Sequence, residues 1–135
     1  MNNYPDVLLA VAGAHLRGQP LNSELTSRGA AFVEATRTMP VYRMFALDTD
    51  PPKPGVVRTA EEGTALEVEV WRLSAEAFGN FVAALPAPMA IGKVELAGGR
   101  TVSGFLVEPV ALESARDISS FGGWKGYLAV PAAGP

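Results

Sequence analysis

The sequence has 135 residues, 48% of them apolar and 19% charged, with a formal net charge of −3. This balance excludes an intrinsically disordered chain, and the absence of a clustered basic stripe makes nucleic acid an unexpected partner. The chain has no cysteine and one histidine, which excludes a disulfide framework and the usual zinc ligand set, so no metal and no cofactor are expected.

We expect one domain over residues 1–135, with a core over about residues 6–129 and a flexible tail over residues 130–135. The first residues lack a basic leader with a cleavage site, and no apolar run is long enough to span a bilayer. We therefore predict a cytoplasmic protein without membrane contacts. Fourteen glycines and eleven prolines indicate short elements separated by frequent turns, which favours a β-rich fold.

The first expected strand covers residues 7–12 and ends at Gly13, where the missing side chain lets other backbone approach closely. The sole histidine, His15, follows two residues later, and Arg17 follows it. Main-chain N–H groups, an imidazole and a guanidinium brought together in this way suit a small anion. The alternative is a tight turn in which the histidine only hydrogen-bonds its neighbours.

Three short elements are expected next. Asn22 or Ser23 can cap one or two helical turns that Gly29 ends. Residues 30–38 read as a second strand, and residues 41–47 as a third that pairs with it after a turn at Pro40. The proline-rich residues 48–55 predict a rigid loop that holds residues 56–58 and forms the rim of a pocket.

Residues 65–73 form the clearest alternating pattern in the chain. One face would carry Leu66, Val68, Val70 and Arg72, and the other Glu67, Glu69, Trp71 and Leu73. At least one of the two carboxylates could therefore face a cavity beside the tryptophan, and the pattern does not decide which. The alternative is an ordinary exposed face.

The second half of the chain begins with Ser74, which can cap a helix over residues 75–85 that Pro86 ends. Residues 91–96 and 101–107 predict two strands of a hairpin that turns at Gly98-Gly99. Residues 111–120 read as a short connection. The aromatic and glycine residues of 121–128 could close the pocket and bring Lys125 to it, or form a docked C-terminus.

Six motifs in order resemble the C-terminal domain of allophanate hydrolase, which is similar to the small γ-glutamylcyclotransferase-like proteins. They are Gly-Ala-His-Leu-x-Gly-x-Pro-Leu-Asn at 13–22, Tyr-Arg-Met-Phe-Ala-Leu at 42–47, Pro-Gly-Val-Val-Arg at 54–58, Glu-Val-Glu-Val-Trp at 67–71, Pro-Ala-Pro-Met-Ala-Ile-Gly at 86–92 and Phe-Gly-Gly-Trp at 121–124. Six motifs in the same order over about residues 6–129 are not expected by chance. The resemblance implies an α+β fold, a small mixed β-barrel with a few short helices.

The resemblance also implies an activity. Allophanate hydrolase breaks allophanate down to ammonia and carbon dioxide in urea catabolism, and its C-terminal domain is proposed to decarboxylate N-carboxycarbamate. The family histidine of that step corresponds to His15. Main-chain N–H groups of Gly13, Ala14 and Leu16 would hold one carboxylate, and the imidazole would donate a proton or hold the other.

Four more side chains are candidate substrate ligands. Arg43, Arg58 and Lys125 could pair with the anion, although each cation is otherwise an ordinary surface residue, and Glu69 could add an acid to the pocket. The expected partners are a small carboxylate-bearing ligand and a separate amidase-signature protein.

The chain departs from the related families in three ways. Cyclotransferases of this fold carry a catalytic glutamate where this chain has Pro86-Ala87-Pro88, and their Tyr-Gly-Ser loop is replaced by Ala12-Gly13-Ala14, so we expect no cyclotransferase activity. The sequence also lacks the glycine- and serine-rich stretch with the Ser-Ser-Lys triad of amidases. We therefore expect that this chain alone does not release ammonia from allophanate.

Three functions remain open from the sequence. The chain is a His15-dependent decarboxylase or lyase of a small carbamate-like dianion, a non-catalytic module that binds a small anion or holds an amidase partner, or a structural domain that forms a homodimer.

Overall fold

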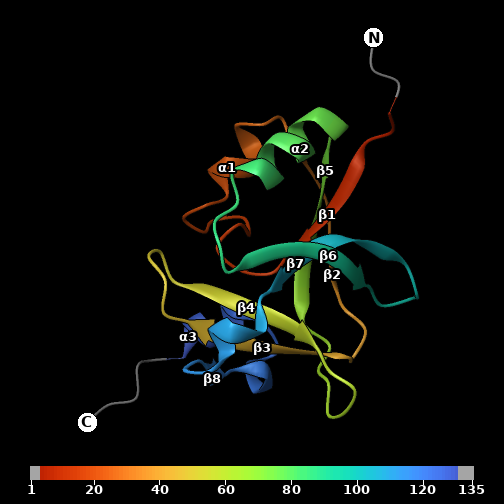
Figure 1. The fold of residues 1–135 in the computed structure, drawn as a ribbon. Coiled ribbons are helices and arrows are strands. Elements are labelled where there is room, and N and C mark those ends of the chain that lie inside the picture. Colours follow the sequence, from red (N-terminus) through yellow and green to blue (C-terminus); the bar gives the residue numbers. More distant parts are fainter. Residues whose placement is uncertain (1–3, 131–135) are drawn as a thin grey trace.

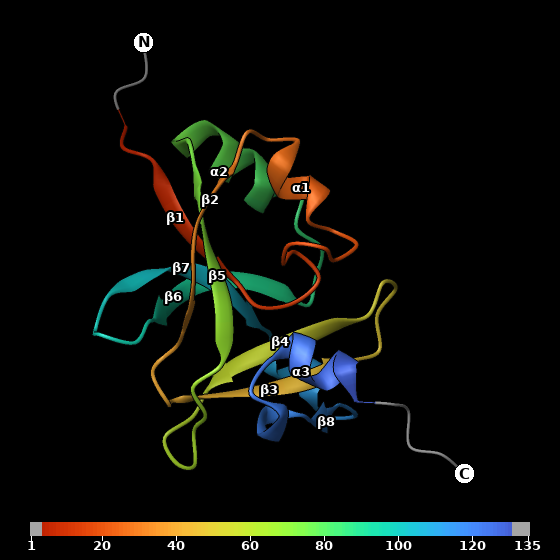
Figure 2. The same cartoon turned by 180° about the vertical axis from the view of Figure 1, so that it is seen from behind.

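The computed structural model describes residues 4–130, whose strands form two β-sheets with short helices at both ends (Figures 1 and 2). The five-stranded sheet has the order β2-β5-β1-β7-β6, with β1 Val7–Val11, β2 Ala31–Arg37, β5 Glu67–Leu73, β6 Met89–Glu95 and β7 Thr101–Val107. The three-stranded sheet has the order β4-β3-β8, with β3 Tyr42–Leu47, β4 Lys53–Arg58 and β8 Arg116–Asp117. The helices are α1 Ser23–Thr26, α2 Ala75–Ala83 and α3 Trp124–Ala129, with 3-10 turns η1 Pro109–Leu112 and η2 Ser119–Phe121.

The expected α+β class is confirmed, but the strands do not close into one barrel within residues 4–130. The backbone hydrogen bonds divide them between two sheets because the chain leaves the larger sheet after β2. Pro40, which has no N–H to donate, lies where the chain turns into the smaller sheet.

β1 is the central strand of the larger sheet. It pairs antiparallel with β5, from Val7↔Leu73 to Val11↔Glu69, and parallel with β7. Neighbours on both sides and packing above and below leave Leu9 and Val11 with no exposed surface. The apolar run therefore forms the buried strand that the sequence predicts, and its end fixes where the following loop begins.

The predicted pairing of the second and third strands is wrong. β2 pairs with β5, and β3 pairs with β4 along its whole length, from Tyr42↔Arg58 to Leu47↔Lys53. The segment expected as a proline-rich loop is therefore partly a strand. Pro54 is tolerated there because β4 is the edge of its sheet, where a missing N–H breaks no ladder.

Residues 111–128, expected as a connection and a tail, contain regular structure. η1, β8 and η2 occupy the connection, and β8 adds a short third strand to the smaller sheet through Phe45↔Asp117. The tail forms α3, which begins at Trp124 and buries that side chain. The expectation for residues 131–135 lies outside the described residues.

Two side-chain hydroxyls hold the sheets and loops together. The Tyr42 hydroxyl, on β3, accepts a hydrogen bond of 2.8 Å from the Glu95 N–H, on β6, and so joins the two sheets. The Ser119 hydroxyl accepts a bond of 2.8 Å from the Met44 N–H. Tyr42 and Met44 are fully buried, and these bonds satisfy polar groups that burial would otherwise leave without partners.

α1 and α2 lie together at one end of the molecule, and α3 lies at the other end beside the smaller sheet (Figures 1 and 2). Phe81 anchors α2 and is 2% exposed. None of the described helices has the length and apolar character needed to cross a lipid bilayer.

Ser74 caps α2 as the sequence predicts, because its hydroxyl accepts a hydrogen bond of 3.1 Å from the Ala77 N–H. We expect Ser74→Ala to lower the free energy of unfolding by about 1 kcal/mol, since one helix N–H loses its partner. Urea denaturation measures the change. Ser114→Ala, at an exposed position of a turn, is the matched control, and equal stabilities of the two variants would contradict this role of Ser74.

Candidate functional site

The loop that follows β1 is held by its own hydrogen bonds. The Leu16 N–H donates to the Gly13 carbonyl at 3.0 Å, and the Leu21 N–H donates to the Ala14 carbonyl at 2.8 Å. Asn22, at the start of α1, donates its side-chain amide to the His15 carbonyl at 2.8 Å and makes no side-chain cap to the helix. The asparagine that the sequence indicated as a helix cap therefore fastens the loop instead.

His15 is turned inward and is 6% exposed. Its Nε2 lies 2.7 Å from the Glu24 Oε1, on α1. The ring stacks on Phe105, of β7, at a centroid distance of 4.9 Å, and the Phe81 ring meets its edge at 5.3 Å. Three separate elements, α1, α2 and β7, therefore fix the orientation of the imidazole.

An ionised carboxylate can only accept a hydrogen bond, so the contact with Glu24 fits the tautomer that carries its hydrogen on Nε2. No described residue hydrogen-bonds Nδ1. A ligand beside the ring would therefore meet Nδ1, with Glu24 behind it.

Burial lowers the pKa of His15 below its ordinary value, because the charged imidazolium loses solvation. The hydrogen bond and the charge of Glu24 oppose this shift, while the positive charges of Lys53 and Arg28 add to it. The imidazole is therefore neutral near pH 7 in the free protein.

A small cavity of about 20 Å³ lies beside His15. Its walls include Gly13, Ala14, Lys53 and Pro54. A Cβ built on Gly13 would lie 2.2 Å from the Pro54 Cδ, so only glycine allows this approach of β4 to the loop. The volume holds about one water molecule.

A second cavity, of about 560 Å³, lies on the other side of the same loop. Leu16 and Arg17 contribute to its wall from the loop, Glu67 and Glu69 from β5, and Lys125 from α3. Both carboxylates that the sequence left open thus line this cavity, but the Glu69 side chain is buried and the Glu67 side chain is half exposed.

Glu69 has hydrogen-bond donors in two segments of the chain and an ion-pair partner in a third. Its Oε1 accepts from the Arg17 N–H at 2.9 Å and from the Trp71 Nε1 at 3.3 Å, and its Oε2 accepts from the Arg17 Nε at 3.1 Å. The Lys125 Nζ lies 3.7 Å from the same Oε2. These contacts compensate a charge that burial would otherwise disfavour.

The predicted site residues thus fall into three places. Gly13, Ala14 and His15 line the small cavity, whereas Leu16, Glu69 and Lys125 line the large one. Arg43 and Arg58 line neither.

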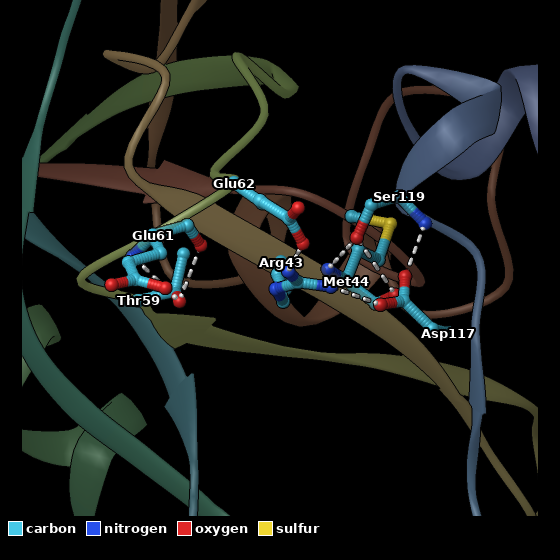
Figure 3. A network of polar contacts seen from close by, with 7 residues as sticks. All are labelled: Arg43, Met44, Thr59, Glu61, Glu62, Asp117 and Ser119. Carbon is cyan, nitrogen blue, oxygen red and sulfur yellow. Dashed lines mark hydrogen bonds and ion pairs between the residues drawn. The ribbon is translucent and has the colours of Figure 1, made fainter.

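Arg43 belongs to a polar network on the smaller sheet, where it donates to Asp117 at 3.0 Å and to Glu62 at 3.1 Å (Figure 3). Arg58 pairs with Glu95 at 3.2 Å. Both guanidinium groups are bound to carboxylates away from His15.

Glu24, Lys53 and Phe105 belong to the surroundings of His15 but were not singled out from the sequence. The sequence could have identified Lys53, because it lies inside the proline-rich segment that was expected to form a pocket rim. No sequence pattern could have identified Glu24 and Phe105, since only the packing of α1 and β7 brings them to the imidazole. Among residues 4–130 no three histidine or acidic side chains gather as a metal ion would require.

The lowered pKa of His15 predicts a stability that depends on pH. Between pH 7.5 and 5.5 the unfolded chain binds a proton on His15 more readily than the folded chain, so the free energy of unfolding falls as the pH falls. The slope from this one group is at most about 1.4 kcal/mol per pH unit. Urea denaturation at several pH values measures it.

His15→Gln is the control for this prediction, because glutamine does not titrate and can still donate to Glu24. Since the sequence has one histidine, the slope over this pH range should flatten in the variant. A slope that is unchanged in His15→Gln, or that has the opposite sign, would show that the imidazole is not held neutral by the fold.

Comparison with known proteins agrees with this architecture. The family model of the allophanate hydrolase C-terminal domain matches residues 7–129. The urea amidolyase of Saccharomyces cerevisiae is 36% identical over 127 residues, which cover 90% of this chain and 7% of that protein. The chain thus spans a small fraction of the curated relatives that it matches.

Two solved structures share the fold closely. Allophanate hydrolase of Kluyveromyces lactis is 36% identical with a TM-score of 0.88, over 92% of this chain and 21% of that one. A uropathogenic E. coli-specific protein is 37% identical with a TM-score of 0.86, over 93% of this chain and 97% of that one.

A γ-glutamyl cyclotransferase shares the fold alone, at 13% identity and a TM-score of 0.55. The fold resemblance expected from the sequence is thus confirmed. From the match over nearly all of the described residues, we conclude that the chain belongs to the allophanate hydrolase C-terminal domain family.

Proposed function

We propose that this chain decarboxylates a small carbamate-like dianion, N-carboxycarbamate in allophanate breakdown, with His15 as the proton donor. The observation that carries the proposal is the contact of 2.7 Å between the half-exposed Glu24 and the buried His15, whose ring lies at the wall of the small cavity. A carboxylate behind an imidazole fixes its tautomer and stabilises the imidazolium when it forms. Membership of the family supports this choice of substrate class.

The neutral resting state of His15 fits such a substrate. Two negative charges beside the ring favour the imidazolium, so binding of the dianion raises the pKa of His15 that burial had lowered. The proton is therefore taken up with the substrate. This coupling keeps the charged form out of the buried site until the anion compensates it.

The substrate carboxylates would meet two kinds of group. Lys53 lines the cavity with its positive charge. The main-chain N–H groups of Ala14 and His15 have no hydrogen-bond acceptor within residues 4–130. The N–H of Leu16 is bonded to Gly13, so it is a weaker candidate than the sequence suggested.

The reaction itself needs one proton. The bond between nitrogen and one carboxyl carbon breaks, its electron pair stays on nitrogen, and the carboxylate leaves as carbon dioxide. The Nδ1 proton of the imidazolium passes to that nitrogen and gives carbamate, and the imidazole stays neutral until it takes up a proton from solvent with the next dianion. A positioned acid of this kind contributes about 10²–10⁴-fold to a rate.

The cavity must widen for this reaction, because about 20 Å³ is far smaller than the dianion. The start of β4 is the wall that must move, since Pro54 rests directly on Gly13. The small volume also favours a second candidate function. In that case the chain holds an amidase partner and performs no chemistry.

The test supplies the chain to a separate amidase that releases ammonia from allophanate and follows carbon dioxide formation. We expect the chain to raise the rate above the spontaneous reaction, and His15→Ala to lose about 10²–10⁴-fold of that increase. Lys93→Ala, exposed on β6 and outside both cavities, should retain it. An increase that survives His15→Ala would contradict the role of the imidazole.

The assembly function gives a different result in the same experiment. The native chain and His15→Ala would both leave the rate at the spontaneous value. Both would nevertheless bind the amidase, which co-sedimentation of the two proteins measures.

Glu24→Gln tests the partner of the imidazole. The amide can accept the Nε2–H but carries no charge, so the imidazolium loses stabilisation and the rate should fall by about tenfold. Because Glu24 raises the pKa of His15, the alkaline limb of the activity profile, where the imidazolium loses its proton, should move to lower pH. A rate profile that does not move would mean that Glu24 has only a structural role.

A further inference from the structure

The large cavity is not used by the proposed reaction. Its volume of about 560 Å³ lies within the range of small-molecule sites, about 300–1,000 Å³. His15 lines the small cavity, whereas the next two residues, Leu16 and Arg17, line the large one. The loop therefore separates two sites of very different size.

The charges around the large cavity leave an excess of one positive charge. Arg17, Arg37 and Lys125 line it, with side chains that are 51%, 52% and 47% exposed, together with Glu67 and Glu69. Arg37 pairs with Glu67 at 3.0 Å. Arg17 and Lys125 share the remaining carboxylate, Glu69.

Glu69 pairs with both cations without using all of their hydrogen-bond donors. Arg17 donates hydrogen bonds from its main-chain N–H and its Nε to the Glu69 carboxylate. Its guanidinium lies over the Phe32 ring, at 3.7 Å from the ring centroid. Its two Nη groups have no hydrogen-bond acceptor among the described residues. The Lys125 Nζ, at 3.7 Å from Glu69, makes an ion pair but no hydrogen bond within residues 4–130. Two cations, of which Arg17 is held by hydrogen bonds, therefore keep free donors beside one cavity.

The rest of the wall is largely apolar. Leu16, Ala35, Val68 and Trp124 contribute to it. A planar guanidinium with two free Nη groups can donate two hydrogen bonds to a ligand carboxylate. The apolar wall can contact the hydrocarbon part of the same ligand. One excess positive charge suits a single carboxylate.

We propose that this cavity binds a small organic monocarboxylate, with the carboxylate between Arg17 and Lys125 and the apolar part against Val68 and Trp124. The site is distinct from the His15 cavity and does not depend on the proposed decarboxylation.

Phenylacetate is the probe for this site. Titrated into the ¹⁵N-labelled chain, it should give saturable shifts of the amide signals of Arg17, Val68, Glu69 and Lys125. Lys125→Gln should weaken binding about tenfold, the loss expected for one charge-assisted contact. Lys125 is half exposed, so this variant keeps the fold, while Arg17→Gln tests the other cation with a thermal melt beside it.

Phenylacetamide and two control variants complete the experiment. The neutral amide should bind about tenfold more weakly than phenylacetate, because it lacks the charge. Lys93→Gln, outside both cavities, should bind phenylacetate as the native chain does, and so should His15→Ala. Binding that persists in His15→Ala separates this site from the proposed reaction, which that variant abolishes.

Three results would overturn the proposal. They are the absence of saturable shifts at millimolar phenylacetate, equal binding of phenylacetamide, and unchanged affinity in both Lys125→Gln and Arg17→Gln.

Discussion

The buried carboxylate of Glu69 is the constraint on which the arrangement of the site depends. A charge that is 4% exposed must be compensated by donors, and the Arg17 main chain supplies the shortest of these bonds, at 2.9 Å. This bond ties the loop after β1 to the neighbouring strand β5. Because Arg17 is fixed, His15, two residues earlier, lies beside Phe105. Leu16, between His15 and Arg17 in the sequence, lies between the two cavities.

The elements that local sequence determines were predictable. The apolar run of β1, the Ser74 cap and the glycine turn of the β6–β7 hairpin each depend on neighbouring residues, and the structure has all of them. Gly98 and Gly99 both have positive φ, of 90° and 91°, which is why two glycines occur there. The fold family could be predicted from the sequence because its motifs extend over about residues 6–129.

The pairing of strands was not predictable in the same way. β2 and β3 are adjacent in sequence, yet they belong to different sheets, because the partner of β2 is the distant strand β5. For the same reason the site could be predicted only in part. His15 and Glu69 were singled out from their local patterns, but Glu24 and Lys53 reach His15 through the packing of α1 and β4. Arg43 and Arg58 had the right charge and are held by other carboxylates.

The central position of β1 has a consequence for how the molecule forms. β1 is the first strand of residues 4–130, but its parallel neighbour β7, which ends at Val107, is separated from it by five other strands in the sequence. Pairing over such a separation carries a large loop-closure entropy, so it tends to be slow and late in folding. The backbone that carries His15 therefore acquires its final geometry only after β7 has left the ribosome.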